Sequence, residues 1–390
     1  MKGFRPDSLP LRSEAELWER QRSGRLRVRV AADYRRLVRE AGLAAAYDDT
    51  DVVVAASAEF TDQASLHLGL GPTDPPIRLR DPQLDGVTAQ AGGSGTDLVL
   101  PLAGGPLEGQ RRGGAQVLAT LLAGGEVAFS AGGEVTPLQP RRELNLQLNR
   151  DQIGQGRLLL HRAIVENGVV AVSSAEGVLR SPWGPLLGPW TSALYSCGGA
   201  GSIGLTMPGL SLLGPGSPVL VAGAVGWVVG RGSAHQPGVR RLASGHARAP
   251  GATAAVCVDW LDLDPRWIRA CFFEGHGSAL LVAIAAPVPL IDGMVALQAS
   301  AEDSALEAPV LDLSIPRRLK PGFGGVPYST LKAGSVPVNG RSVPAAPAHS
   351  PRLAEEVAED LARRLRQDAF PLRLPLQPLT SRSSLLPLEA

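Results

Sequence analysis

The stretch Val219–Gly238 reads VLVAGAVGWVVGRGSAHQPG and joins an apolar run of strand length to a glycine-rich turn. The turn presents His235 and Gln236 together with free backbone N–H groups. Ligand sites usually form where a few polar groups converge beside apolar structure, so this stretch predicts a central strand of a sheet with a binding site at its end. The alternative is an ordinary turn with a solvated histidine, since most loop residues carry no function.

A second block, Glu274–Ser278, has the same pattern, because EGHGS precedes the apolar run LLVAIAAPVPLI. Two glycine-flanked histidines beside buried strands, His235 and His276, predict one shared pocket. Near neutral pH either imidazole could pass a proton to a carbonyl oxygen, with Gln236 and Ser278 binding the substrate. For each histidine the alternative is a turn residue that donates to a backbone carbonyl.

Composition bounds the class of protein. The chain has 390 residues, 44% of them apolar, which is enough for one large domain or two ordinary ones. Its 38 basic and 37 acidic side chains leave a net charge of +1, which argues against a nucleic-acid partner. Only Arg20–Arg29 (RQRSGRLRVR) is locally basic, and we interpret it as a solvated helix end followed by an edge strand, with nucleic-acid contact as the alternative.

The cysteines and the apolar runs indicate a cytoplasmic protein that does not enter a membrane. Cys197, Cys257 and Cys271 match no zinc pattern and could hold no iron–sulfur cluster, and a sparse, odd count fits a reducing compartment. The N-terminus lacks a hydrophobic signal core. The longest apolar runs, near Val219–Val229 and Ala279–Ile291, are too short to span a bilayer.

Helix and strand patterns alternate at the start of the chain. Ser13 and Glu16 form a capping-box pattern ahead of a short helix that Ser23–Gly24 ends. The elements that follow are a strand at Arg25–Val30, a helix at Ala31–Glu40 and a strand at Thr50–Ala56. This order predicts an α/β protein, with a mixed sheet, flanking helices and long Gly/Pro-rich loops.

The rest of the chain continues this mixture. Strands are predicted at Leu98–Leu102, Glu126–Ser130, Arg142–Leu148, Gly168–Ser173, Val219–Val229, Ala254–Val258 and Ala279–Ile284. Helices are predicted at Gly113–Leu122, at Ile153–Ile164 and from Pro265 to Cys271 with Asp264 as cap. Leu179–Pro218 is dominated by proline and glycine, and a loop of that length is unusual unless it carries a site.

The C-terminal helix is the clearest element of the sequence. Ser350 is its predicted N-cap, Pro351 takes the first helical position, and leucine or valine recurs every four residues from Leu353. We expect one main domain over residues 10–370 and an extended C-terminal tail over residues 371–390.

Gly199–Gly204 (GAGSIG) matches the glycine spacing of dinucleotide-binding proteins, but the context does not fit. The fingerprint needs a buried strand before it and a helix opening within it, whereas Pro208 falls where that helix should run. A proline inside a helix costs about 3 kcal/mol. We therefore predict a flexible loop against a pocket, where glycine lets the backbone approach a ligand closely.

Cys197 lies beside that loop, in the segment YSCGG. A cysteine among serine and glycine can act as a nucleophile if a nearby cation lowers the pKa of its thiol. The alternative is a small, inert side chain. Cys257 alternates into a predicted core strand and Cys271 lies beside two phenylalanines, so we expect both to be structural.

Several short blocks, in this order along most of the chain, resemble the homocysteine biosynthesis (DUF39) family, whose characterised activity is L-aspartate semialdehyde sulfurtransferase. The blocks are Thr73–Arg78 (TDPPIR), Gln139–Glu143 (QPRRE), Ala234–Gly238 (AHQPG), Phe273–Ser278 (FEGHGS), Ala308–Asp312 (APVLD), Tyr328–Gly334 (YSTLKAG) and Val343–Pro347 (VPAAP).

The resemblance implies sulfur insertion into L-aspartate semialdehyde to form homocysteine, a step of amino-acid biosynthesis toward methionine. An enzyme persulfide would deliver the sulfur, with an external sulfur donor, an external reductant such as a ferredoxin-type protein, and no bound cofactor. It also allows a homo-oligomer. Arg78 and Arg141 would hold the substrate carboxylate, because arginine binds a carboxylate through two parallel hydrogen bonds, and Asp74 would be a further substrate-binding residue.

The chain departs from the family at its cysteines. The family carries a catalytic cysteine in a pattern resembling Thr-Asp-Cys-Tyr-Pro-Arg, and here Thr136–Arg141 reads TPLQPR with Leu138 at that position. A second family cysteine aligns near Asp62. Three alternatives follow: Cys197 has taken over the role, the chemistry differs, or this relative only binds an amino-acid-like ligand or a partner protein.

Overall fold

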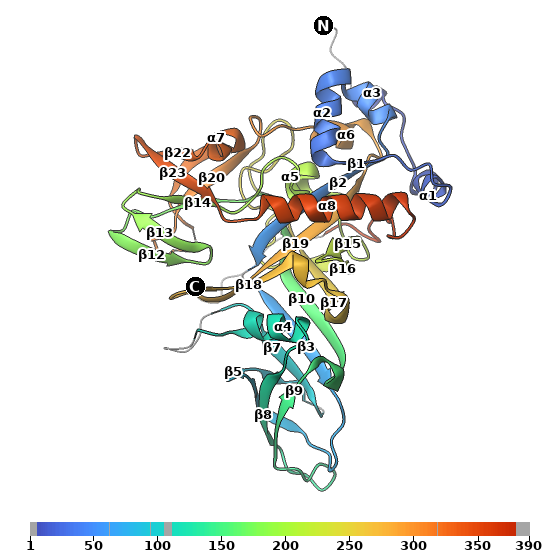
Figure 1. Cartoon of the computed structure of the whole chain (residues 1–390). Coiled ribbons are helices and arrows are strands. Elements are labelled where there is room, and N and C mark those ends of the chain that lie inside the picture. The colour runs from blue at the N-terminus through green and yellow to red at the C-terminus, as the bar shows by residue number, and fades with distance from the viewer. Residues whose placement is uncertain (1–5, 62, 94, 105–110, 318, 380–390) are drawn as a thin grey trace.

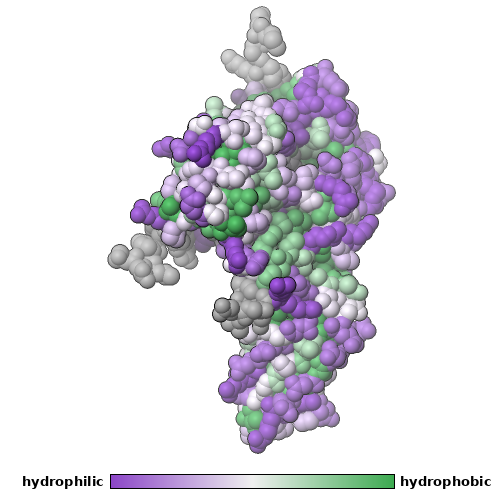
Figure 2. All heavy atoms as spheres, turned by 60° about the vertical axis from the view of Figure 1, so that its left-hand side comes forward, coloured by the Kyte–Doolittle hydropathy of each residue, from purple (hydrophilic) through white to green (hydrophobic). Residues whose placement is uncertain are grey.

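The computed structural model describes residues 6–61, 63–93, 95–104, 111–317 and 319–379. An upper body carries the long helix α8 across its front, and a lobe of strands extends below it (Figure 1). Apolar surface lies between the upper body and the lower lobe, flanked by hydrophilic side chains (Figure 2). The described helices are α1 (Glu14–Arg22), α2 (Ala31–Ala41), α3 (Leu43–Asp48), α4 (Gly114–Leu122), α5 (Ile203–Thr206), α6 (Gly293–Ala299), α7 (Tyr328–Lys332) and α8 (Pro351–Arg366).

The largest sheet crosses both parts of the molecule. Its hydrogen-bonded order is β1-β2-β19-β15-β16-β17-β10-β3-β7-β6, and β18 pairs with β19 off this path. The strands are β1 (Val28–Val30), β2 (Val52–Thr61), β3 (Ala64–Leu70), β6 (Gln90–Ala91), β7 (Asp97–Pro101), β10 (Ile153–Val165), β15 (Pro218–Val221), β16 (Ala224–Arg231), β17 (Thr253–Asp259), β18 (Ile268–Phe273) and β19 (Gly277–Pro289).

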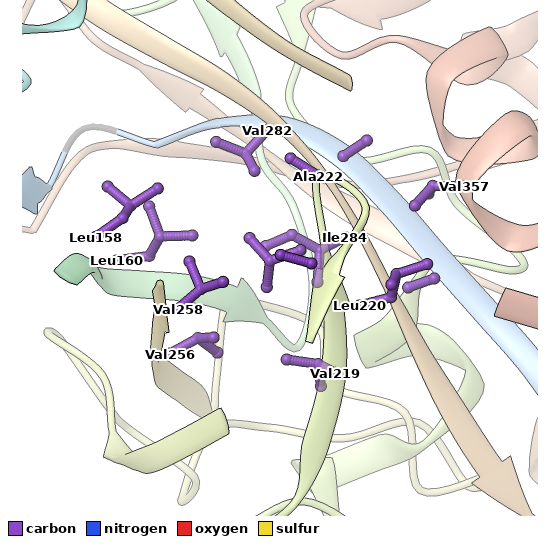
Figure 3. Close-up of a cluster of buried hydrophobic side chains, with 14 of the residues drawn as sticks. Leu158, Leu160, Val219, Leu220, Ala222, Val256, Val258, Val282, Ile284 and Val357 are labelled. Atoms are coloured by element: carbon purple, nitrogen blue, oxygen red, sulfur yellow. The ribbon is translucent and has the colours of Figure 1, made fainter. Parts of the chain in front are cut away.

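β19 is an interior strand of this sheet and is buried along its whole length. Its near-continuous apolar sequence suits a strand covered on both faces. It pairs antiparallel with β2 from Leu280↔Thr61 to Pro289↔Val52, and α8 packs across both strands. The sheet curls on itself, so that Leu158 of β10, Val256 of β17 and Ile284 of β19 meet in one apolar cluster (Figure 3).

In the described part of the chain, a four-stranded and a six-stranded sheet and a two-stranded hairpin accompany the main sheet. The lower lobe holds the order β5-β4-β8-β9, with β4 (Leu79–Leu84), β5 (Val87–Thr88), β8 (Val127–Gly133) and β9 (Glu143–Leu148). The upper body holds the order β21-β20-β11-β14-β23-β22, with β11 (Val170–Val172), β14 (Ala193–Tyr195), β20 (Glu307–Asp312), β21 (Gly322–Pro327), β22 (Ser335–Val338) and β23 (Arg341–Pro347). This six-stranded sheet has its own apolar cluster around Tyr328 and Val310.

The α/β class with mixed sheets is confirmed, since the main sheet and the six-stranded sheet each contain parallel and antiparallel pairs. The capping box of Ser13 and Glu16 forms as predicted. Gly42, at φ 85°, ends α2 in a conformation that glycine tolerates. Ser350 accepts a hydrogen bond from the backbone N–H of Leu353 and starts α8.

The helix predicted at Ile153–Ile164 is wrong, because this segment is the long strand β10. Leu158 and Leu160 point into the core while their neighbours are more exposed, which is the alternation of a strand. β10 also has a partner on each side, β17 and β3, so both of its edges are hydrogen-bonded. These long-range pairings override the local helical pattern.

Three other predictions need correction. The predicted strand Val219–Val229 is a hairpin of β15 and β16, which turns at Ala222 and Gly223, both at positive φ. The predicted helix from Pro265 is only a 3₁₀ turn capped by Asp264, and Cys271 lies on β18 because this segment pairs with β19. The predicted loop at 179–218 contains β14, α5 and the hairpin of β12 (Gly177–Ser181) and β13 (Gly184–Gly188).

Candidate functional site

Two cavities lie on either side of the segment Tyr195–Ser202, which follows β14. The first, here called the β10 cavity, has a volume of about 200 Å³ and is lined by residues of β2 and β10 together with Ser196. The second, here called the α8 cavity, has a volume of about 410 Å³ and is lined by residues of α2, β2 and α8 together with Gly198 and Ser202. Ser57 of β2 borders both.

Cys197 is 3% exposed and lines neither cavity itself, but its neighbour Ser196 lines the β10 cavity and Gly198 lines the α8 cavity. Its thiol donates to the Oγ of Ser202 over 3.3 Å. Burial raises the pKa of the Cys197 thiol to about 12, and the negative charge of Glu59 acts in the same direction. The thiol is therefore protonated at neutral pH, and a thiolate must be formed by transferring its proton to a neighbouring base.

Glu59 of β2 is that neighbour. Burial raises the pKa of the Glu59 carboxyl to about 7, while hydrogen bonds from Cys197 and Ser57 oppose the rise. A carboxyl with a pKa near the working pH is well matched to accept and return a proton. Because the two groups interact directly, Glu59 and Cys197 titrate as a pair.

The wall behind the thiol is held rigidly. Tyr328 donates its hydroxyl to Oδ1 of Asn167 over 2.6 Å, and Nδ2 of Asn167 donates to the carbonyls of Ala247 and Glu307 over 2.7 and 2.8 Å. A Cβ on Gly168 would lie 2.4 Å from Cβ of Cys197, so this close approach requires glycine.

Arg162 lines the β10 cavity, and the α8 cavity is lined by Arg35, Lys332 and His349. Burial lowers the pKa of the Arg35 guanidinium, and the Nη1 atom of Arg35 is buried without a hydrogen-bond partner. Lys332 also borders the cavity and pairs with Asp303 at 2.6 Å. His349 lies on the same wall, and burial lowers the pKa of its imidazole to about 4, which leaves it neutral at pH 7.

The glycine-rich loop predicted to approach a ligand forms part of this cavity wall. Gly201, at φ 94°, lies against the guanidinium of Arg35, and a Cβ there would be 3.0 Å from Nη1. The backbone N–H of Ala200 donates to the carboxylate of Asp303 over 2.8 Å. The helix that follows, α5, has only four residues, which differs from the long helix of a dinucleotide-binding motif.

The predicted histidines do not line either cavity. His235, on the loop after β16, accepts a hydrogen bond from the backbone N–H of Thr253 at Nδ1 over 3.0 Å, and its Nε2 is buried without a partner. His276 lies in the turn between β18 and β19. The backbone N–H of Gln236 donates to Gly251, which ties the His235 loop to the start of β17.

Ser278 is 2% exposed and connects β19 to the N-terminus of α4. Its hydroxyl donates to the carbonyl of Leu102 over 3.0 Å and accepts from the backbone N–H of Ala115 over 3.1 Å. The hydroxyl of Ser278 is therefore used to hold α4 against the main sheet.

The predicted carboxylate-binding residues lie in the lower lobe. The backbone N–H of Arg141 donates to the carbonyl of Pro76 over 3.4 Å, so the loops that carry Arg141 and Arg78 meet. Arg78 pairs with Glu134 at 3.3 Å, and Asp74 lies in the same connection from β3 to β4. β8 and β9, whose ends carry these loops, belong to the lower lobe, whereas β14 belongs to the upper body (Figure 1).

The structure therefore brings Arg78 and Arg141 together but does not bring them to Cys197. Leu138, on the loop between β8 and β9, is 85% exposed, and Asp62 lies outside the described residues.

Sequence reasoning missed Glu59, Arg35 and His349. A signal existed for Glu59, because a carboxylate inside the apolar run VVVAASAEF is costly to bury without a purpose. Arg35 and His349 carry no such signal, since arginine on an amphipathic helix and histidine before a helix cap are both common.

Among the described residues no cluster of three or more histidine, cysteine or acidic side chains could hold a metal ion. None of the helices in the described part of the chain has both the length and the apolar character needed to cross a membrane.

Comparison with known proteins identifies relatives of this chain. L-aspartate semialdehyde sulfurtransferase of Methanosarcina acetivorans is 26% identical over 374 residues, covering 96% of this chain and 73% of that protein. The enzyme of the same name from Methanocaldococcus jannaschii is 27% identical over 365 residues, covering 89% of this chain and 69% of that protein. No solved structure matches the chain. The profile described as "Homocysteine biosynthesis enzyme, sulfur-incorporation" matches residues 27–372, and the chain belongs to this family.

Proposed function

We propose that this protein inserts sulfur into L-aspartate semialdehyde to form homocysteine, with Cys197 as the sulfur carrier. Family membership and the printed activity of two relatives support the reaction. One observation carries the choice of residue: the Cys197 thiol interacts with Glu59, which lines the β10 cavity, and the residues on either side of Cys197 line the two cavities.

The chemistry assigns a step to each group. Glu59 takes the thiol proton, and the Cys197 thiolate attacks the sulfane sulfur of an external donor, forming an S–S bond as the donor leaves as a thiol. Reduction of this persulfide restores the thiol and frees the sulfur, which replaces the carbonyl oxygen of the aldehyde with loss of water. A second reduction converts the thioaldehyde to the thiol of homocysteine. An external reductant, in our proposal a ferredoxin-type protein, supplies the electrons.

The contacts favour Glu59 over His235 or His276 as the proton acceptor. Glu59 interacts with the buried thiol, whereas His235 bonds to the backbone of Thr253. Proton transfer by either histidine, and substrate binding by the lower-lobe arginines, stay predictions that substitution can test. A cytoplasmic location and a homo-oligomeric state also stay predictions.

Growth of a homocysteine auxotroph tests the proposal. The wild-type gene should restore growth, Cys197→Ala should abolish it, and Cys257→Ala and Cys271→Ala should retain it, because these two cysteines lie on paired strands of the main sheet. Purified protein treated with a sulfane-sulfur donor should carry a persulfide on Cys197, detected by mass spectrometry after alkylation. Growth supported by Cys197→Ala would remove Cys197 from the reaction.

A second candidate is a non-catalytic relative that binds an amino-acid-like ligand or a partner protein. Leu138 favours it, because leucine stands where the resemblance places the family cysteine and has no nucleophile. This candidate predicts no growth with the wild-type gene, even though the purified protein is folded and binds its ligand.

A further inference from the structure

We propose that the α8 cavity binds the amino-acid end of the substrate, with Arg35 receiving its α-carboxylate. This inference rests on the proposed function and adds to it the place of the substrate carboxylate. It differs from the expectation that Arg78 and Arg141 hold that group.

Arg35 has unused hydrogen-bonding capacity at a buried position. Its side chain is 12% exposed, and Nη1 is buried with no hydrogen-bond partner. The nearest acidic group, Glu302, reaches only Nε of Arg35, at 3.8 Å, and it is also shared with Arg39. A buried charged donor left unpaired is costly, and in native proteins such a group usually has a partner. An anionic ligand in the adjoining cavity would supply one.

The cavity suits a small zwitterion in size and charge. Its volume of about 410 Å³ exceeds by far the roughly 30 Å³ that one water occupies in the liquid. Arg35 and Lys332 place positive charge on one part of the lining, while Glu355 and Glu359 place negative charge along α8. A carboxylate can bind arginine through two parallel hydrogen bonds, and the carboxylates of α8 complement an α-ammonium group.

The cavity also adjoins the proposed sulfur carrier. Ser202 lines the α8 cavity, and its hydroxyl is bonded to the Cys197 thiol. Ser57, on the same lining, is bonded to Glu59. A ligand in this cavity is therefore one side chain away from both the thiol and its base.

The lower-lobe arginines fit this task less well. Arg78 already pairs with Glu134, and its side chain is 39% exposed, so water competes for its hydrogen bonds. Arg35 is the more buried of the two cations, and it borders a cavity that adjoins Cys197.

Calorimetric titration with two probes tests the proposal. L-homoserine has the substrate's amino-acid end with an alcohol in place of the aldehyde, and 3-aminopropan-1-ol is the same molecule without the carboxylate. The wild-type protein should bind L-homoserine and bind 3-aminopropan-1-ol at least about tenfold more weakly, since a charge-assisted pair is lost. Arg35→Gln should weaken L-homoserine binding by a similar factor and leave 3-aminopropan-1-ol unchanged, while Arg35→Lys should lie between.

Arg39→Gln is the matched control, because Arg39 lies one turn further along α2, pairs with the same Glu302 and does not line the cavity. It should bind L-homoserine as the wild type does. Cys197→Ala should also retain binding, which separates this inference from the sulfur-carrier role. Equal binding of both probes by the wild type, undiminished L-homoserine binding by a folded Arg35→Gln variant, or no L-homoserine binding by the wild type would each overturn the proposal.

Discussion

At the scale of single residues, the chemistry of this protein depends on Glu59 and Cys197: the charge of Glu59 raises the pKa of the Cys197 thiol, whereas the contact with Cys197 lowers the pKa of the Glu59 carboxyl. Cys197 is buried and Glu59 is partly buried, and a negative charge on Glu59 disfavours a negative charge on Cys197. The pair is therefore more stable with one proton bound than with both groups ionised. A single negative charge that moves from the carboxylate to the sulfur gives the cysteine its nucleophilic thiolate form.

Glu59→Gln tests this coupling through the pH dependence of stability. The folded pKa of Glu59 is about 7, above the ordinary 4.5, so the neutral form is favoured by folding. That contribution is complete below pH 4.5 and is lost as the pH rises through 7. Glutamine stays neutral, so the variant should match the wild type near pH 4.5 and exceed its unfolding free energy at pH 8 by up to about 3 kcal/mol.

Urea denaturation at the two pH values measures the difference, and the exposed Glu176→Gln serves as control. The Glu59→Gln variant should also lose persulfide formation on Cys197. If the difference in unfolding free energy between Glu59→Gln and the wild type were the same at both pH values, the pKa of Glu59 would not be raised in the folded protein.

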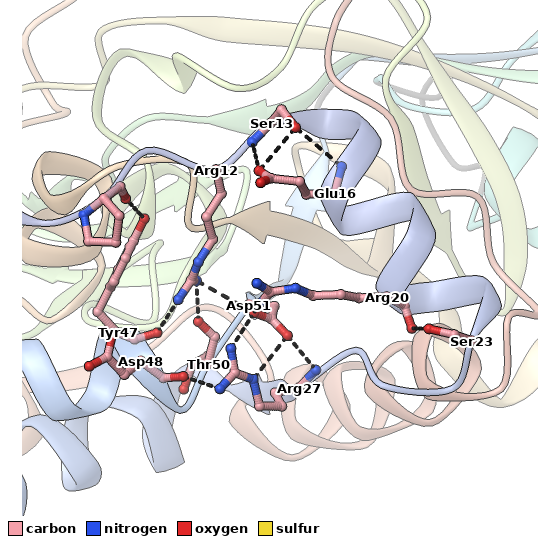
Figure 4. A network of polar contacts seen from close by, with 11 residues as sticks. Arg12, Ser13, Glu16, Arg20, Ser23, Arg27, Tyr47, Asp48, Thr50 and Asp51 are labelled. Carbon is pink, nitrogen blue, oxygen red and sulfur yellow. Dashed lines mark hydrogen bonds and ion pairs between the residues drawn. The ribbon is translucent and has the colours of Figure 1, made fainter.

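At the scale of elements, Asp51 joins the N-terminal helix to the main sheet (Figure 4). Its side chain is fully buried and contacts Arg12, Arg20 and Arg27, with Arg27 Nη2 at 2.8 Å. Burial works against the charge of Asp51, but the hydrogen bonds and charge of Arg27, with the charge of Arg20, outweigh it and lower the pKa of the carboxyl. This carboxylate connects α1, the segment before β1, and the start of β2.

Asp51→Asn should cost about 3–5 kcal/mol of unfolding free energy at pH 7, because buried arginine charge loses its partner. The stabilising contribution of Asp51 is present above the ordinary pKa of aspartate and is lost as the pH falls through its lowered folded value. The gap between variant and wild type should therefore narrow in acid. Asp49→Asn is the control, because Asp49 is half-exposed and its pair with Arg29 should contribute no more than about 1 kcal/mol.

At the scale of the whole molecule, the C-terminal segment closes the fold against its beginning. The indole N–H of Trp18 in α1 donates to the carbonyl of Leu372, and the backbone N–H of Leu374 donates to Glu14 over 3.0 Å. The start of the predicted tail thus lies against α1, and the backbone N–H of Leu376 donates to the carbonyl of Pro215 over 3.0 Å. Residues 380–390 lie outside the described part of the chain.

Leu372→Ala should lower the unfolding free energy by about 2–4 kcal/mol, because Leu372 is 3% exposed and its removal leaves a cavity in the core. Leu376→Ala is a matched control in the same segment, since Leu376 is 86% exposed and should change stability by no more than about 0.5 kcal/mol. Chemical denaturation followed by tryptophan fluorescence measures both. Equal effects of the two substitutions would mean that the segment is not held against α1 in solution.

Local signals in the sequence determined the elements that local interactions stabilise. The caps at Ser13 and Ser350, the stop at Gly42 and the apolar strand β19 all depend on residues within a few positions of one another. β10 shows where this fails, because its strand form depends on partners far away in the chain, β3 and β17. The family, too, was recognisable from short blocks in the right order.

Only the tertiary structure decided the site. Cys197 was identifiable from its glycine-rich loop, but its partners come from β2, α2 and the segment before α8, and no local pattern relates Glu59 or Arg35 to that loop. The physical reason is that pairing of β2 with β19 and packing of α8 across both create the dry interior in which these groups meet. A pKa shifted by burial is a property of that interior, so it exists only once distant segments have excluded water together.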